Sequence, residues 1–94
     1  YRDDRVMAFL DIVPAAPEHI LVIPAQPLTF LRTADESHET LIGHMALMAD
    51  RIASERGIRD SGYRLTVNQG PDAGQQVDHL HMHLLGGQKL GGVA

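Results

Sequence analysis

Three histidines alternate with apolar residues near the end of this 94-residue chain, at His79, His81 and His83. Successive side chains of a β-strand point to opposite faces, so a strand here would place all three imidazoles on one face. Imidazoles are a poor way to fill a surface, and three of them seldom arise side by side without a use. We therefore interpret the row as a chemical site.

Two kinds of chemistry use such a row. Neutral histidine is a common metal ligand, and an imidazole can also act as a nucleophile that its neighbours support. The row is about 13 Å long at the rise of a strand, so three rings do not easily reach one ion. Asp78 points to the other face, and no glutamate follows. The histidines alone leave both a metal site and a nucleophile open.

The loop before the row, Gln69–Gln76, contains two glycines and a proline. Glycine lets backbone N–H groups approach a ligand closely, and such a nest binds an anion with neutral donors. Neutral donors suit this region, because Lys89 is the only Lys or Arg in residues 65–94. We expect the loop to hold a phosphate beside the histidines, which favours a nucleophile over a metal site.

The composition narrows the classes of protein to which the chain can belong. Zero cysteines exclude disulfides, thiolate metal sites and thiol nucleophiles. The net charge of −4 argues against nonspecific binding to nucleic acid, which depends on Lys and Arg at the phosphates. No apolar run approaches the roughly 18–20 residues that cross a bilayer, so we expect no membrane partner. An apolar fraction of 44% supplies one core, and we expect residues 1–94 to form a single domain.

One long helix is predicted in the middle of the chain. Thr33 and Glu36 have the spacing of a capping box at its start, and Gly57 can end it. An apolar stripe follows one helical face, formed by Leu41, Met45, Met48 and Ile52. His38 and His44 lie outside the histidine row, and we expect both to be exposed to solvent.

Strands are predicted on both sides of this helix, at Val6–Ile12, His19–Ile23, Tyr63–Asn68 and Val77–Leu85. This order predicts an α+β fold, with an antiparallel sheet and the one long helix packed on one of its faces. The last two strands are separated only by the Gln69–Gln76 loop, so we expect them to be hairpin neighbours.

The residues described so far resemble the signature of the histidine triad family. That signature has three histidines alternating with apolar residues and then two more apolar residues, as in residues 79–85 (HLHMHLL). The resemblance to the Hint branch of the family extends along nearly the whole chain, through residues 3–5, 9–12, 19–24, 68–70, 74–75 and 85–87. The Hint branch comprises small purine nucleoside phosphoramidases, which hydrolyse a nucleoside monophosphate from an amine such as a lysine side chain.

The resemblance implies a role for each of four histidines. His81 would attack the α-phosphorus and carry a nucleotidyl group, which water then removes. His83 would contact the phosphate and assist the leaving group. His79 and His19 would form a hydrogen-bonded relay behind the nucleophile. A neutral imidazole is a competent nucleophile near pH 7, and a covalent route splits one displacement at phosphorus into two easier ones.

The resemblance also implies a nucleotide-binding set. Asp11 would hold the ribose hydroxyls, although a residue at a strand end equally suits an Asx turn. Ile12 would line the base pocket. The phosphate would be gripped by Asn68, Gly74, Gln75 and Gln76. Gln76 stands where the animal Hint proteins have a serine.

Further expectations follow from the same resemblance. It implies a HIT-like fold, a homodimer and a cytoplasmic enzyme that requires no metal or cofactor. The helix stripe or its flank would contribute to the interface between subunits. Members of the family have a further strand before the position of Tyr1, so we expect the domain to lack its N-terminal segment here.

We therefore expect a hydrolase that cleaves a nucleoside 5′-monophosphate, AMP in particular, from an amine or another leaving group through a nucleotidyl-histidine intermediate. A hydrolase of dinucleoside polyphosphates would use the same nucleophile on a different leaving group. From another class, a nucleotide-binding module with negligible turnover would act through partners. The metal site remains the third alternative.

Overall fold

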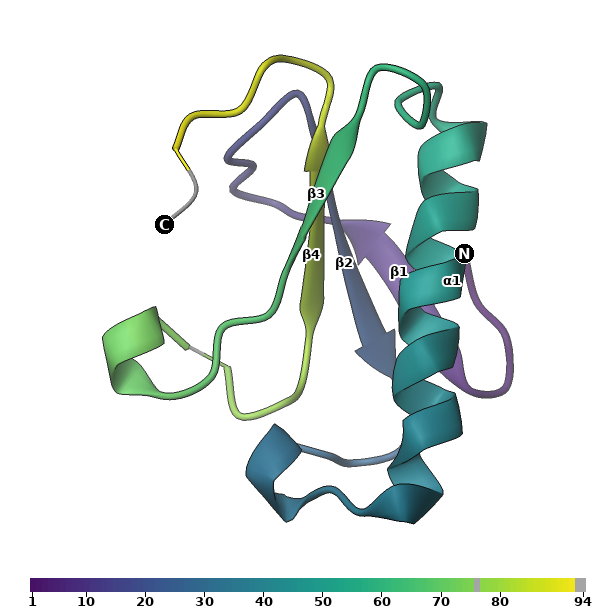
Figure 1. Cartoon of the computed structure of the whole chain (residues 1–94), viewed down its shortest axis with the longest axis vertical. Helices are drawn as coiled ribbons and strands as arrows, with labels where there is room; N and C mark the ends of the chain where they lie inside the picture. The colour runs from purple at the N-terminus through teal and green to yellow at the C-terminus, as the bar shows by residue number, and fades with distance from the viewer. Residues whose placement is uncertain (76, 93–94) are drawn as a thin grey trace.

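Short apolar and β-branched runs form four strands in the computed structural model, which describes residues 1–75 and 77–92. The strands are β1 (Val6–Leu10), β2 (Glu18–Pro24), β3 (Tyr63–Thr66) and β4 (Met82–Gly86). They form one antiparallel sheet in the order β1-β2-β4-β3 (Figure 1). β3 and β4 pair directly, which confirms that they are neighbours.

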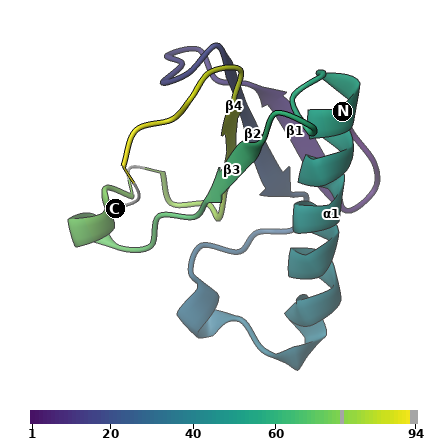
Figure 2. The same cartoon turned by 45° about the horizontal axis from the view of Figure 1, so that its top comes forward.

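The long helix α1 (Glu39–Glu55) covers one face of this sheet and confirms the predicted α+β fold (Figure 2). The core between them is formed by Val6, Ile20, Val22, Leu28, Leu41, Met45, Ala49, Ile52, Ala53, Ile58, Leu80, Met82 and Leu84. Truncation of a fully buried residue such as Leu84 to alanine costs about 2–5 kcal/mol in a core of this kind. Among the described residues, no helix combines the length and the apolar character that a membrane span needs.

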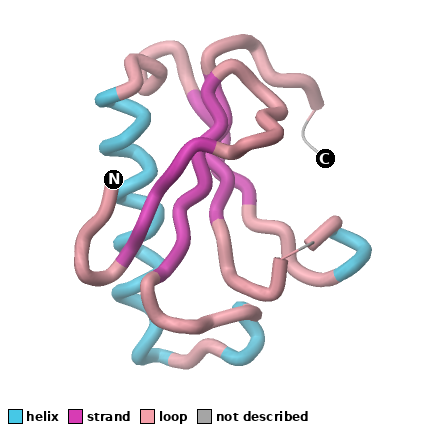
Figure 3. Tube along the Cα trace, turned by 180° about the vertical axis from the view of Figure 1, so that it is seen from behind, coloured by secondary structure: helices cyan, strands magenta, loops and turns pink. Residues whose placement is uncertain are grey.

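The opposite face of the sheet is the one that matters for chemistry. Seen from behind in Figure 3, α1 lies on the far side of the strands. The strand register places Phe9 opposite Leu21, and Leu21 opposite His83. Paired residues of antiparallel strands share a face, so these three side chains form a row across β1, β2 and β4 on the open face.

Three predicted strands are shorter in the structure, and one of them is β3, which ends at Thr66 rather than at Asn68. β4 begins at Met82 rather than at Val77, so His79 and His81 precede the strand. The reason is the extent of its neighbours: β3 ends at Thr66, opposite His83, and pairing with β2 reaches only as far as Met82. β1 ends at Leu10 instead of Ile12, because the chain turns immediately after it.

The predicted capping box is wrong in its residues. Thr33 ends a short 3-10 helix, η1 (Leu31–Thr33), and its hydroxyl donates to the carbonyl of Phe30. The box forms instead around Asp35, which caps a second 3-10 helix, η2 (Glu36–His38), immediately before α1. Its short carboxylate accepts from the N–H of Ser37 at 2.8 Å. At the other end of α1, Gly57 has φ +76°, as a helix-ending glycine requires.

The predicted exposure of His38 and His44 is wrong, because both side chains have local partners. Their exposed fractions are only 18% and 14%. His38 Nδ1 accepts from the N–H of Asp35 at 3.0 Å and so completes the capping box. His44 Nε2 lies 2.7 Å from Asp3 Oδ2, while Arg5 Nη2 donates to its other ring nitrogen at 3.3 Å. The hydrogen bond from His44 is the main reason that the pKa of Asp3 lies well below its ordinary value.

Candidate active site

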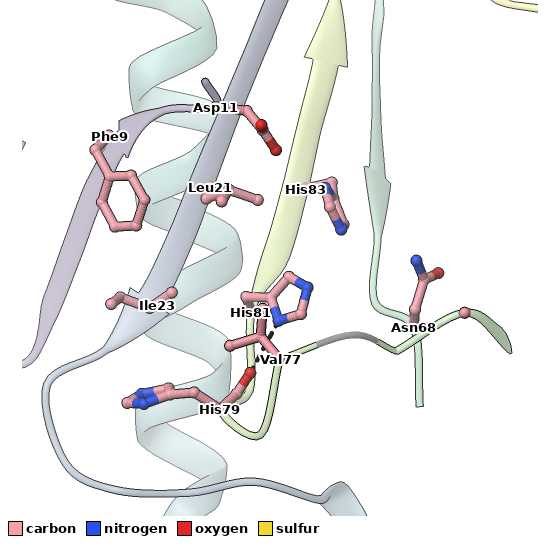
Figure 4. A pocket seen from close by; sticks show the side chains of 10 residues that line it. Phe9, Asp11, Leu21, Ile23, Asn68, Val77, His79, His81 and His83 are labelled. Atoms are coloured by element: carbon pink, nitrogen blue, oxygen red, sulfur yellow. Dashed lines mark hydrogen bonds between the residues drawn. The ribbon is translucent and has the colours of Figure 1, made fainter. Parts of the chain in front are cut away.

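A pocket of about 580 Å³ opens on the face of the sheet away from α1 (Figure 4). It is lined by Phe9, Asp11, Leu21, Ile23, Asn68, Gly74, Val77, His79, His81 and His83. The volume lies within the range of roughly 300–1,000 Å³ that is typical of small-molecule sites. Four of the six histidines of the chain meet at or beside it, since His19 contacts His83 from the neighbouring strand.

The apolar wall of the pocket comes from β1 and β2. Phe9 on β1 and Leu21 and Ile23 on β2 lie along one side of it, as Figure 4 shows. Residue types alone did not single out these three. Their side chains point to the same face of the sheet as that of His83. This can be deduced only when the register of β1, β2 and β4 is known.

His81 has its ring held by the backbone. Its Nδ1 lies 2.8 Å from the carbonyl oxygen of His79, and a carbonyl can only accept a hydrogen bond. His81 therefore carries its proton on Nδ1. Its Nε2 retains a free lone pair, which is the form that a nucleophilic imidazole needs.

His19 and His83 form a pair on the diagonal between β2 and β4. The two residues are 64 positions apart in sequence, yet His19 Nε2 lies 2.8 Å from His83 Nδ1. The other ring nitrogen of His19 accepts from the backbone N–H of Ala15 at 2.9 Å. His19 is 6% exposed, so both of its ring nitrogens are occupied inside the protein.

The surroundings of His83 keep its ring neutral. Burial is the first cause that lowers the pKa of His83, because a charged imidazolium loses its hydration there. The neighbouring His81 and His19 lower that pKa further, whereas the carboxylate of Asp11 opposes them. The net direction is downward, so His83 is uncharged near neutral pH.

Asp11 forms an Asx turn and also lines the pocket. Its Oδ1 accepts from the N–H of Val13 at 2.8 Å, which is the Asx turn that ends β1. Its Oδ2 lies 3.5 Å from His19 Nε2 and is 18% exposed at the pocket wall as part of the side chain. One carboxylate oxygen thus forms the Asx turn, and the other lies beside His19 at the pocket.

Asp11, His19 and His83 also form a group with the ligand atoms of a metal site, all within 4.8 Å of one another. The hydrogen bond at the other ring nitrogen of His19 does not suit a metal ligand, however. A histidine that binds a metal through one nitrogen carries a proton on the other and donates it to an acceptor. His19 Nδ1 instead receives the N–H of Ala15 and cannot donate. The arrangement instead suits a hydrogen bond between His19 and His83.

The backbone of the loop before the histidines differs from the predicted anion-binding nest. In the segment Gly70–Gln75, the N–H groups of Ala73 and Gln75 donate to the carbonyl of Gly70, and that of Gly74 donates to Pro71. These bonds close a short 3-10 turn, η3 (Pro71–Ala73). The donors expected to face a phosphate are therefore used within the loop. Gln76 lies outside the described residues.

The side chain of Gln75, which was expected to contact the phosphate, makes its hydrogen bonds inside the loop. Its Oε1 accepts from the N–H of Gly70 at 2.8 Å, while its Nε2 donates to the carbonyl of Val77 at 3.3 Å. Gln75 therefore joins the two ends of the loop. Asn68 and Gly74 remain as pocket-lining residues on this side.

Two further predicted positions differ in the structure. Ile12 is 94% exposed and does not line the pocket; it is the middle residue of the Asx turn that joins Asp11 to Val13. The ring of His79 does not contact His19; its Nε2 donates to the carbonyl of Pro24 at 3.0 Å. His79 contacts His81 through its backbone carbonyl and not through its ring. The hydrogen bond between two imidazole rings joins His19 to His83.

Asn68 follows the end of β3 and lies across the pocket from His81 (Figure 4). Its side-chain amide makes no hydrogen bond to any residue that the structure describes, and only its backbone carbonyl is engaged, by Gln69. An amide group that faces a pocket without an internal partner is available to a ligand.

Comparison with known proteins places this geometry in context. The model of the HIT domain matches residues 1–90. An uncharacterized HIT-like protein of Synechococcus elongatus is 50% identical over 90 residues, which cover 96% of this chain and 78% of that protein. The purine nucleoside phosphoramidase of Escherichia coli K12 is 47% identical over 91 residues, covering 97% and 76%. A HIT family hydrolase of Clostridium thermocellum superposes with a TM-score of 0.94 at 43% identity, covering 99% and 81%.

Proposed function

Because the chain belongs to the histidine triad (HIT) family of hydrolases, we propose that it hydrolyses a purine nucleoside 5′-monophosphate, AMP in particular, from an amine. The observation that carries this proposal is the hydrogen bond from His81 Nδ1 to the carbonyl of His79, which leaves Nε2 as a free nucleophile in the pocket. The E. coli relative is named a purine nucleoside phosphoramidase.

His81 Nε2 attacks the α-phosphorus, so that an N–P bond to the histidine forms while the bond from phosphorus to the amine breaks. Water then attacks the same phosphorus and releases the histidine. Over both steps, water supplies a hydroxyl group to phosphorus and a proton to the departing amine. His83 donates a hydrogen bond from the pocket wall to the substrate at the reacting centre.

The apolar wall supports a flat base as part of the substrate. Phe9, Leu21 and Ile23 lie together, and Phe9 is 49% exposed and so available for contact with a purine. Asp11 Oδ2 lies near the wall and accepts from the ribose hydroxyls. Asn68 donates from the opposite side to the phosphate.

The charge of the pocket favours a monophosphate over a polyphosphate. Among the residues that the structure describes, its lining contains no Lys or Arg and one carboxylate, that of Asp11. Such a lining stabilises a single phosphate diester or amide through neutral donors, whereas several adjacent phosphates need cationic partners. A neutral amine is therefore a better match for the leaving group than a second nucleotide.

We extend the proposal to a homodimer. Leu41, Met45 and Ile52 of the stripe on α1 are buried against the protomer's own sheet, so the flank of the stripe is the better candidate for the interface. Leu47 on the outer face of α1 is 68% exposed, and Leu65 on the edge strand β3 is 37% exposed. A second subunit that covers these side chains would remove apolar surface from water.

The direct experiment is rapid quenching of the enzyme with adenosine 5′-phosphoramidate labelled at phosphorus, followed by mass mapping. A nucleotidyl group on His81 is the expected adduct, and an adduct on any other residue overturns the mechanism. Steady-state assays with a diadenosine polyphosphate and with the phosphoramidate separate the alternatives. Faster turnover of the polyphosphate identifies the first alternative, and tight AMP binding without turnover of either identifies a binding module. Activity that vanishes with chelator and returns with zinc identifies a metal enzyme.

A further inference from the structure

The open face of the sheet holds two imidazoles of opposite hydrogen-bonding polarity. His81 donates through Nδ1 to a carbonyl and presents a lone pair on Nε2. His83 has no such carbonyl at Nδ1, which instead faces another imidazole, that of His19. The polarity of His83 is therefore decided by how His19 is held.

His19 is held by a group whose direction is unambiguous. A backbone N–H can only donate, and that of Ala15 lies 2.9 Å from His19 Nδ1. His19 Nδ1 must accept this bond, so the proton of the neutral ring resides on Nε2. The carboxylate of Asp11, 3.5 Å from the same Nε2, favours the proton at that position.

The protonation of His19 on Nε2 determines which nitrogen of His83 is protonated. Because His19 Nε2 donates across 2.8 Å, His83 Nδ1 must accept, and the proton of His83 resides on Nε2. A second proton on His83 Nδ1 would face the N–H of His19, and His19 cannot reverse while Ala15 donates to it. Figure 4 shows the ring of His83 facing the space between His81 and Asn68.

We infer that the backbone N–H of Ala15 sets the tautomer of His83 through His19 and holds His83 as a neutral hydrogen-bond donor to the substrate. Ala15 and His19 are then positioning residues, since neither acts on the substrate in this role. The part that concerns substrate rests on the proposed function, whereas the placement of protons is a property of the resting protein.

Several features of the loop between β1 and β2 hold the N–H of Ala15 in place. Asp11 and Val13 form the Asx turn at its start, and Ala16 is buried, with 8% of its surface exposed. Pro14 and Pro17 restrict the backbone on either side of Ala15. Asp11 belongs to the same loop, so the segment that holds the ribose also determines which nitrogen of His83 carries the proton.

The test is a long-range proton–nitrogen NMR correlation on protein labelled with ¹⁵N-histidine, at a pH where the rings are neutral. The two nitrogens of each ring report which one is protonated. We expect the proton on Nδ1 for His81 and on Nε2 for both His19 and His83. A proton on Nδ1 of His83 overturns the inference, and this result requires no variant.

The substitution Ala15→Pro removes the N–H, whereas Ala15→Gly retains it and serves as the matched control. With Ala15→Pro we expect mixed tautomers at His19 and His83 and an unchanged His81, because the partner of His81 is the carbonyl of His79. Unchanged tautomers in the folded proline variant overturn the inference. Should that variant not fold, His19→Phe removes the same donor to His83 and must produce the same mixing there.

Turnover provides a separate arm. A neutral His83 predicts that kcat/KM does not fall as pH rises through the ordinary histidine range, and that a folded Ala15→Pro variant loses about tenfold in kcat/KM, as for one lost hydrogen bond. A fall of kcat/KM with rising pH there means that a charged His83 is required, and contradicts the inference. Correct tautomers without any turnover contradict only the proposed function.

Discussion

The carbonyl oxygen of His79 lies 2.8 Å from Nδ1 of His81, so one member of the histidine row orients the next through its backbone rather than through its ring. This contact explains why His79 and His81 need not lie within β4. A single hydrogen bond between residues two positions apart determines which nitrogen of His81 faces the pocket.

The first prediction concerns this nucleophile. His81→Ala should lower turnover of an adenosine phosphoramidate by about three orders of magnitude or more, because the two-step route no longer exists. AMP binding should persist, since the apolar wall and Asp11 do not depend on the His81 ring. Single-turnover kinetics and calorimetry measure the two quantities. His38→Ala, on η2 and outside the pocket, is the control, and equal losses in both variants would contradict the assignment.

The second prediction concerns the ribose. Asp11→Ala should weaken AMP binding by about 1–3 kcal/mol through loss of charge-assisted hydrogen bonds. Asp11→Asn retains an oxygen for the N–H of Val13, so the difference between the variants separates the Asx turn from the ribose contact. Calorimetry with AMP and with its 2′,3′-dideoxy form is the measurement. Equal affinity of the unmodified protein for the two ligands would refute the role of Asp11.

The third prediction is a pH dependence of stability. The pKa of His83 is held below its ordinary value of about 6.5, chiefly by burial. Between the lowered and the ordinary pKa, the unfolded chain binds more protons than the folded protein does. The free energy of unfolding therefore rises with pH across that window and falls as pH decreases below about 6.5.

Urea unfolding across this window measures the slope, and His83→Asn should reduce it, because asparagine does not titrate. All remaining groups are the same in both proteins, so only the difference between the two slopes is assigned to His83. An unchanged slope in the variant would show that His83 does not have a lowered pKa.

The fourth prediction concerns the loop before the histidines. Gln75→Ala should destabilise the protein by about 0.5–1.5 kcal/mol and accelerate hydrogen exchange at Gly70, whose N–H donates to the Gln75 side chain. Gln75→Glu retains that acceptor but cannot donate to the carbonyl of Val77. It should therefore protect Gly70 while losing part of the stability. Identical exchange at Gly70 in all three proteins would contradict the role of Gln75.

The fifth prediction concerns assembly. Light scattering at micromolar concentration should show a homodimer, and Leu47→Asp should shift it toward the monomer by placing a charge in an apolar interface. Leu31→Asp places the same charge at another exposed leucine, on η1 and 41% exposed, and is the control. A stable monomer of the unmodified protein, or equal dissociation in both variants, would contradict the proposal.

The sequence predicted those features that depend on local periodicity. The α1 stripe, the pairing of β3 with β4 and the single helix on one face are each confirmed, because spacing and loop length determine them. The extent of β4 could not be predicted in the same way. Alternation continues from Val77 to His81, but a strand also needs partners, and β3 ends opposite His83.

The site shows the same division. The histidine row and Asp11 are visible as residue types at recognisable positions, and they do gather at one pocket or beside it. The apolar wall of Phe9, Leu21 and Ile23 depends on the register of three strands, which no short segment reveals. The contribution of Ala15 is a backbone N–H and therefore leaves no trace in the identity of its side chain.

The position of β4 has a consequence for the order of folding. β4 lies between β2 and β3 in the sheet and supplies both Met82 and Leu84 to the core. During synthesis, α1 and the other three strands emerge first, and β2 and β3 then lack the strand that joins them. Contacts across such a separation close late, since the chain must first lose the entropy of a long loop. β4 thus completes the core and delivers His83 to His19 together, so a nascent chain that ends before β4 has neither a finished core nor the site.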